Sequence, residues 1–364
     1  MVVLEIDNTK VEPAMIVSTP LNHLIKDAIL NCEPIDNTLH VITVISNICE
    51  FKRRWFLMKE FIKRMDDIPN IQLYIVEIAY GNQDFHITDE NNSKHLQLRC
   101  EHALWHKENM VNLGIKKLLP DNWKAVAWVD GDIEFDDPNW SLNCLKILNH
   151  FDFVQLFTTC MDLDNNEIPM NIWQSYGYKY AHGYPFQQLK GINYWHSGYG
   201  WACKREIYER MGGLFDKGIL GSGDYILCQA ILKKPAFISH KLNGFKNEIH
   251  NFIKKIYTYI DVIDAVSDID AVSDIDAVSD IDDVSNVSNN IKVGYVPTNI
   301  KHYFHGSKVN RKYIERNEIL IKHNFDPAIH LKYDENGVII PTELMSADFL
   351  QDILHYFSQR NEDE

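Results

Sequence analysis

The feature that most limits what this chain can fold into is a regular alternation of strand-like and helix-like segments. Apolar residues, many of them β-branched, run almost continuously over 39–47, 71–81 and 125–135, as they do in strands buried on both faces. Between them, 51–65 and 102–119 repeat apolar side chains every three or four positions, which is typical of amphipathic helices. The sequence therefore predicts an α/β fold with a Rossmann-like, mostly parallel central sheet covered by helices on both faces.

Later segments continue the pattern. The predicted elements are strands over 151–157 and 291–306, and helices from about residue 204, after 221–224, over 308–323 and from 346.

A low-complexity repeat interrupts this pattern. The hexamers VIDAVS, DIDAVS, DIDAVS and DIDDVS fill 262–285, too few to bury the core of a β-helix, and no glycine supplies the turns of a calcium loop. We therefore expect the Asp-rich stretch 261–290 to be a solvated insertion. It divides a domain predicted over 39–325, with 1–38 and 326–364 as N-terminal and C-terminal extensions.

Charge and cysteine content narrow the function class and the compartment. The net charge is −15, and nine Asp residues in 261–290 account for most of it, so no basic surface for nucleic acid is indicated. The seven cysteines are odd in number and contain no C-x-x-C pair, which favours free thiols. Neither a signal peptide nor a transmembrane segment is apparent, so the sequence predicts a cytoplasmic protein.

Two acidic residues follow the apolar run 125–129. Asp130 and Asp132 flank Gly131, and alternate residues of an extended segment project the same way, so both carboxylates can face one Mg²⁺ or Mn²⁺ ion. The carboxyl end of a buried strand is where such sheets bind ligands. The alternative is that both residues only cap a strand-to-loop turn.

Two further segments carry candidate groups. His302 and His305 precede Lys308, Arg311 and Lys312, so an imidazole ligand for Mn²⁺ lies beside cations able to face a diphosphate. The alternative is a cap or a surface histidine.

In GSGD, glycines allow close approach to a ligand, and Asp224 could act as a general base. The alternative is that Asp224 is the N-cap of a helix.

Together these motifs carry a resemblance. AWVDGDIEF resembles the DxD strand of nucleotide-sugar-dependent glycosyltransferases of the GT-A fold, and HYFHG resembles the late His segment of their metal site. HSGYGWACKREIYERMGGLFDKGILGSGDYILCQAI is similar to the Gly-rich loop, helix and acidic motif of family-2-like enzymes and galactosyltransferases. KENMVNLGI resembles the helix before the DxD strand. The resemblance covers about 39–325.

The resemblance implies roles for the acidic and imidazole groups. Asp132 would bind the metal, Asp130 would contact the ribose or the metal through water, and His305 would be a further ligand in preference to His302. Asp224 matches the catalytic base, although the Glu that precedes it in that family is Gly223 here.

Other residues would contact the donor or the acceptor. The predicted donor contacts are Lys107, Asn112, Arg53 and Lys308. Gly223 and the aromatic residues Trp195, Tyr199 and Trp201 would contact the sugar or the acceptor, although core packing accounts for the aromatic residues equally well.

The implied reaction is metal-dependent transfer of a sugar from a UDP- or GDP-sugar to a hydroxyl of a glycan, protein or lipid, with inversion and with Mn²⁺ or Mg²⁺ as cofactor. One alternative is a haloacid-dehalogenase-like phosphatase, whose first Asp is a phosphorylated nucleophile, although that motif usually lies in the first strand and here follows two strand-helix units. The other is a non-catalytic protein that binds carbohydrate or Ca²⁺.

Overall fold

A seven-stranded sheet forms the centre of the computed structural model, which describes residues 20–184, 195–232, 250–268, 291–313 and 315–364. In spatial order its strands are β11 (Val293–Tyr295), β6 (Phe153–Gln155), β10 (Gly200–Lys204), β4 (Ala125–Val129), β1 (Leu39–Ser46), β2 (Ile71–Tyr80) and β3 (His95–Cys100). Only β10 runs antiparallel to its neighbours. The predicted α/β fold with a mostly parallel central sheet is confirmed.

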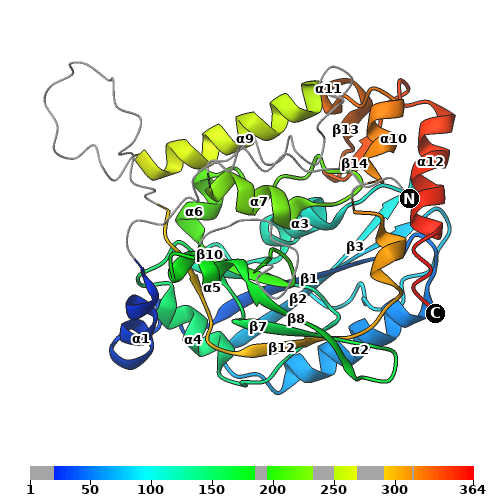
Figure 1. Cartoon of the computed structure of the whole chain (residues 1–364). Helices are drawn as coiled ribbons and strands as arrows, with labels where there is room; N and C mark the ends of the chain where they lie inside the picture. Colours follow the sequence, from blue (N-terminus) through cyan, green and yellow to red (C-terminus); the bar gives the residue numbers. More distant parts are fainter. Residues whose placement is uncertain (1–19, 185–194, 233–249, 269–290, 314) are drawn as a thin grey trace, which may run out of the picture.

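Helices cover both faces because successive side chains of the strands point to opposite sides. On β1, Val41 belongs to a core shared with α1 (Asn22–Asn31), α2 (Lys52–Asp66) and α4 (Trp140–Ile147). Its neighbour Ile42 belongs to a second core with α3 (Lys107–Leu118), α6 (Arg205–Arg210), α7 (Gly223–Ile231) and α9 (His250–Asp268). Figure 1 shows α9 and α7 above the sheet, and α2 and α4 below it.

A second sheet crosses the carboxyl end of β4. It has the order β5 (Ile133–Phe135), β12 (Asn299–His302), β7 (Thr159–Leu163), β8 (Pro169–Ser175) and β9 (Trp195–His196). β12 pairs with both β5 and β7, which places His302 opposite Ile133 on one side and opposite Asp162 on the other. This sheet therefore carries two distant segments of the chain to the Asp130–Asp132 turn.

One of the remaining elements is a short helix that packs beside β6, β8, β9 and β11, and the others belong to the C-terminal part of the chain. They are α5 (Tyr176–Ala181), the 3₁₀ helix η2 (Lys308–Arg311), α10 (Asn317–Lys322), α11 (Pro327–His330), the ribbon β13 (Leu331–Tyr333) and β14 (Ile339–Pro341), and α12 (Ala347–Ser358). None of the helices in the described ranges is long and apolar enough to cross a membrane.

Three predicted elements are wrong in extent. The run 125–135 is two strands, β4 and β5, in different sheets, and 291–306 likewise divides into β11 and β12. Apolar composition shows that such a run is buried but does not show where it changes sheets.

The helix predicted over 308–323 is η2 followed by α10, with a left-handed residue, Lys312, after η2 (φ 43°). In one continuous helix Arg311 and Arg316 would point about 140° apart. The break lets both turn inward, Arg311 to His305 and Arg316 to Ser222.

The start of the Asp-rich repeat is helical and not a loop. α9 continues to Asp268, and Ile253, Ile256, Ile260 and Ile263 extend one buried stripe into the first hexamer. Their spacing of three and four residues explains the helix. The rest of the predicted insertion, 269–290, lies outside the described residues, as do residues 1–19 of the predicted N-terminal extension.

Candidate functional site

Asp132, in the turn between β4 and β5, faces two histidines. Its Oδ2 lies 2.9 Å from Nε2 of His305 and 3.8 Å from Nε2 of His302. One ligand atom from each of the three residues lies within 4.8 Å of the others, so the three can bind one metal ion. The sequence predicts Asp132 and His305 as metal ligands and His302 as a less favoured ligand. The structure brings both histidines to Asp132.

Each imidazole is held from behind by a buried carboxylate. Nδ1 of His302 lies 3.0 Å from Oδ1 of Asp162, and Nδ1 of His305 lies 3.3 Å from Oε2 of Glu362. Both carboxylate side chains are 1% exposed. An Nδ1–H donated to a carboxylate leaves the Nε2 lone pair free, as in the carboxylate-backed histidines of metal sites.

The donor set fits a divalent cation. With both Nδ1 atoms protonated, two Nε2 lone pairs face an anionic oxygen. Arg311 NH2, 2.7 Å from Nε2 of His305, can donate to one of these lone pairs, and a divalent cation would satisfy both lone pairs and the carboxylate together. Asp132 Oδ1 is also buried and has no hydrogen-bond partner among the described residues. Burial lowers the pKa of His302 and so favours its neutral, metal-binding form.

Lys107, the first residue of α3, joins the other two predicted acids. Its Nζ lies 2.7 Å from Oδ1 of Asp130 and 2.9 Å from Oδ2 of Asp224. Burial raises the pKa of Asp130 to about 6, with Lys107 opposing the rise and Asp132 and Asp224 adding to it. Asp130 therefore pairs with Lys107 and lies outside the three-residue cluster that could hold a metal.

Lys107, Asp130, Asp132 and His305 line one pocket of about 120 Å³, whereas His302 and Asp224 are not among its lining residues. Its charged lining residues are Arg54, Lys107, Asp130, Asp132, Arg311 and Arg360. A larger hollow of about 580 Å³ lies elsewhere, between α3 and α6, and contains none of the histidines above. We place the candidate site at the smaller pocket, because that is where the carboxylates and imidazoles converge.

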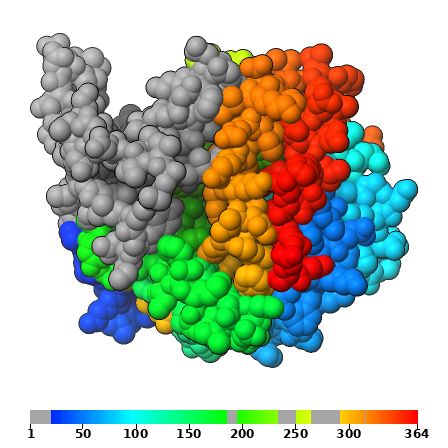
Figure 2. Space-filling model, turned by 45° about the vertical axis from the view of Figure 1, so that its right-hand side comes forward, coloured from blue at the N-terminus to red at the C-terminus, as the bar shows by residue number. Residues whose placement is uncertain are grey.

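Residues near the C-terminus complete the pocket. Glu362 Oε2 lies 2.7 Å from NH1 of Arg54, and Tyr356 donates a hydrogen bond to the carbonyl of Arg311. Figure 2 shows the segment around residues 300–320 and the C-terminal residues side by side on one face. Neither Asp162 nor Glu362 was predicted from the sequence, because no local pattern marks a residue that acts through a partner 140 or 57 positions away in the chain.

Asp224 is not the helix N-cap that the alternative interpretation proposed. The N-cap of α7 is Ser222, and Asp224 lies in the first turn with its carboxylate on Lys107. Gly223 is needed for packing: a Cβ there would lie 2.2 Å from Oε1 of Glu108. The space that a side chain at Gly223 would need is thus filled by Glu108.

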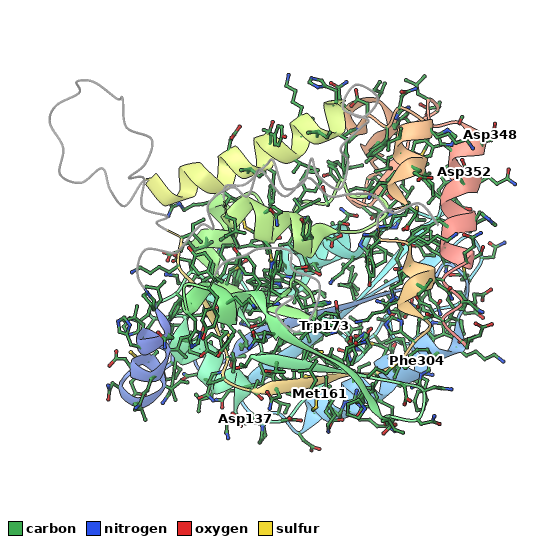
Figure 3. The ribbon with its side chains drawn as sticks, viewed as in Figure 1. Asp137, Met161, Trp173, Phe304, Asp348 and Asp352 are labelled. Carbon is green, nitrogen blue, oxygen red and sulfur yellow. The ribbon has the colours of Figure 1, made fainter. Side chains whose placement is uncertain are left out.

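Three predicted donor contacts are engaged away from this pocket. Asn112 bonds to the backbone of Leu214 and to the Tyr208 hydroxyl. Arg53 donates a hydrogen bond from Nε to the carbonyl of Phe304, which Figure 3 labels. Its neighbour Arg54 lines the pocket instead, because adjacent residues of a helix point about 100° apart. Lys308 pairs with Asp162 behind His302.

The three predicted sugar-contacting aromatic residues are buried, so the core-packing alternative describes them better. Trp201 is 0% exposed within β10, and Trp195 stacks on Tyr225. Tyr199 is 5% exposed, and its hydroxyl donates to Asp162 at 2.8 Å. Tyr199 therefore supports the carboxylate behind His302.

No protein-family model matches this chain, and no curated protein matches it. Among solved structures, the catalytic domain of Drosophila β1,4-galactosyltransferase 7 in complex with xylobiose matches at 12% identity with a TM-score of 0.27, over 54% of this chain and 62% of that chain. The complex of a mutant of that enzyme with manganese, UDP-Gal and xylobiose matches at 12% identity with a TM-score of 0.30, over 54% and 61%.

A third match is the mannosyltransferase PcManGT from Pyrobaculum calidifontis in complex with GDP-Man and Mn²⁺, at 14% identity with a TM-score of 0.31, over 70% of this chain and 84% of that chain. In its two matches to the Drosophila enzyme, this chain covers about three fifths of the length of the Drosophila catalytic domain. These likenesses are distant, with identities of 12–14% and TM-scores of 0.27–0.31.

Proposed function

We propose that this protein is a metal-dependent glycosyltransferase that moves a sugar from a UDP- or GDP-sugar to a hydroxyl of a glycan, protein or lipid. The observation that carries the proposal is the meeting of Asp132, His302 and His305 at the carboxyl end of β4, with both imidazoles backed by buried carboxylates. One carboxylate oxygen and two imidazole nitrogens suit Mn²⁺, or Mg²⁺ less well, and leave coordination positions for phosphate oxygens.

The pocket is partly open to solvent, so a diphosphate and its ion would lie in it and the rest of the donor would lie along the adjoining surface. The bound ion would neutralise charge that develops on the leaving diphosphate. Arg54 and Arg311 line the same pocket and would face that anion. Arg311 NH2 now lies 2.7 Å from Nε2 of His305, so it would turn toward phosphate when that lone pair binds the ion. A hollow of only about 20 Å³, lined by Ile48, Trp105 and Phe357, adjoins the pocket, so the nucleoside would lie on the surface over these residues and not inside the hollow.

Asp224 is our candidate for the general base. Its carboxylate is 19% exposed, and Lys107 holds it beside Asp130. A carboxylate fixed in this way could remove the proton from an acceptor hydroxyl that attacks the anomeric carbon opposite the leaving group, which would invert the configuration. Asp130, held by Lys107, would contact the ribose.

The test is incubation of the protein with a panel of UDP- and GDP-sugars and Mn²⁺. We expect release of nucleoside diphosphate from at least one donor, and its loss on chelation. Release of inorganic phosphate from simple monoesters would favour the phosphatase alternative. Sugar or Ca²⁺ binding without turnover would favour a non-catalytic protein.

Two variants separate metal binding from chemistry. Asp132→Ala should abolish Mn²⁺-dependent nucleotide binding, because it removes the oxygen ligand between the histidines. Asp224→Asn should keep that binding and stop transfer. Asp348→Ala, which removes an exposed carboxylate on α12 (Figure 3), is the matched control. It should change neither Mn²⁺-dependent nucleotide binding nor transfer. Unchanged Mn²⁺-dependent nucleotide affinity in Asp132→Ala would show that the metal assignment is wrong.

A further inference from the structure

A second group of metal-binding side chains lies far from the pocket, where the end of α1 meets the end of α4. Asp27 lies on α1, Cys32 is the C-cap of α1, and His150 lies between α4 and β6. One ligand atom from each residue lies within 4.8 Å of the other two. We propose that Asp27, Cys32 and His150 bind a thiophilic divalent cation, zinc foremost, which ties α1 to the body of the domain.

The carboxylate of Asp27 and the sulfur of Cys32 both approach the same nitrogen of His150, which favours a cation between the three residues. Asp27 Oδ2 lies 3.0 Å and Cys32 Sγ lies 3.5 Å from the same imidazole atom, Nε2 of His150. One ring nitrogen has either one proton to donate or one lone pair to accept with, so it makes one good hydrogen bond and not two. A metal ion between the three atoms satisfies the carboxylate, the thiolate and the nitrogen together.

The same geometry excludes a nucleophile–base–acid triad. In such a triad the acid binds Nδ1 of the histidine while Nε2 faces the nucleophile. Here the carboxylate and the sulfur both lie at Nε2. A cysteine nucleophile activated by His150 is therefore not supported.

The distances suit tetrahedral zinc. Zinc bonds of about 2.3 Å to sulfur and about 2.0–2.2 Å to nitrogen or oxygen give ligand–ligand edges of about 3.5 Å for S–N and about 3.3 Å for N–O. The observed separations are 3.5 Å and 3.0 Å. A mixed sulfur, nitrogen and oxygen set favours zinc over the oxygen-preferring Mg²⁺ and Ca²⁺. Asp27 is 47% and His150 31% exposed, so a fourth position is open to water.

The surrounding contacts fix the three residues in place. Asn31, one turn further along α1, donates to Oδ1 of Asp27 at 2.8 Å and leaves Oδ2 toward His150. Across the junction, Lys146 donates to the carbonyl of Ile29 at 3.1 Å, and Asn149 donates to the carbonyl of Glu33 at 2.8 Å. The two chain segments that carry the ligands are thus bonded to each other, and the site needs little rearrangement to bind metal.

The test uses Co²⁺ as a spectroscopic substitute for zinc in the full chain after metal removal. A thiolate ligand gives a near-ultraviolet sulfur-to-cobalt absorption band, which the Asp132, His302 and His305 cluster cannot give because it contains no sulfur. We expect the band in the wild type and its displacement by Zn²⁺. Cys32→Ser should abolish the band. Cys49→Ser is the matched control, because Cys49 is the other partly exposed free cysteine, and it should keep the band.

Two further variants keep the proposal falsifiable if Cys32→Ser folds poorly. Asp27→Asn and His150→Ala should each weaken Co²⁺ binding, measured by titration of the band, by about tenfold or more. No band in the wild type at excess Co²⁺, a band retained in Cys32→Ser, or unchanged affinity in both ligand variants would each overturn the proposal. None of these readouts depends on transferase activity.

Discussion

At the residue scale, the geometry of the pocket depends on which imidazole nitrogen carries the proton. Asp162 and Glu362 each face an Nδ1 atom, and the opposite nitrogens point to one oxygen of Asp132. The burial of these two acids is sustained by cations: Lys308 pairs with Asp162, and Arg54 and Arg360 pair with Glu362. Burial opposes the charge of both acids, but His302 and then Lys308 hold the pKa of Asp162 below its usual range, and Arg54, Arg360 and His305 do the same for Glu362. Both carboxylates therefore stay charged and act as positioning residues.

A substitution at Asp162 tests this positioning role. Asp162→Asn keeps a similar shape but removes the charge that holds Nδ1–H of His302, so we expect Mn²⁺ affinity to fall by about 10–100-fold. The measurement is free Mn²⁺ by electron paramagnetic resonance during titration. Asp164→Asn, in the turn after the same strand, is the control. Wild-type Mn²⁺ affinity in a folded Asp162→Asn protein would contradict the role.

At the element scale, the segment that follows α12 closes the site and also completes α2. Phe51, the N-cap of α2, offers no side-chain cap, and the Asp363 carboxylate instead accepts from the amides of Lys52 and Arg53 at 3.1 and 2.8 Å. An acid at a helix N-terminus satisfies unpaired N–H groups there. One residue before it, Glu362 reaches His305. The same short segment thus caps a helix and orients a metal ligand.

Gly306 controls how closely this segment approaches the site. Gly306 has φ +83°, and a Cβ there would lie 2.8 Å from the carbonyl oxygen of Asn361 and 3.0 Å from that of Arg360. Because these are backbone atoms, Gly306→Ala should displace the segment and loosen Glu362 from His305. We expect a loss of about 1–3 kcal/mol of unfolding free energy from backbone strain, together with weaker Mn²⁺ binding.

The matched control for Gly306 is Gly212, which has φ +73° and no atom within 4 Å of an added Cβ. Gly212→Ala should show the strain cost in denaturant unfolding without any change in Mn²⁺ affinity. Equal Mn²⁺ affinity in Gly306→Ala and Gly212→Ala would show that the contact with Asn361 does not support the site.

At the scale of the whole molecule, the sequence correctly predicts the helices and strands that have a strong local pattern of apolar residues. β1, α2 and β2 match their predicted ranges closely, because strong apolar patterns and polar boundaries define them. In the second sheet, the sequence does not predict β7, β8 or β9; β8 is mostly exposed and lacks a buried strand's composition. In the site, Asp132 and His305 were found from short motifs. Their partners Asp162 and Glu362 are brought to the site by the pairing of β7 with β12 and by the folding of the C-terminal residues against His305. Neither kind of contact can be recognised from the residues next to Asp162 or Glu362 in the sequence.

The stability of the whole molecule should depend on pH through Glu108. This residue of α3 is 5% exposed, and burial raises its pKa to about 8, with Asp224 adding to the rise and Lys107 opposing it. Between the ordinary pKa of a glutamate, about 4.3, and about 8, the folded protein keeps a proton that the unfolded chain has lost. Stability from this group is therefore fully present below that window and falls as pH rises through it, by up to about 1.4 kcal/mol per pH unit.

Glu108→Gln stays neutral and can still accept a hydrogen bond from Nε1 of Trp105. Denaturant unfolding across this pH window should therefore show a flatter dependence of stability on pH than in the wild type. Glu101→Gln, at an exposed site, should leave the wild-type slope intact, and an equally steep slope in Glu108→Gln would rule out Glu108 as its source.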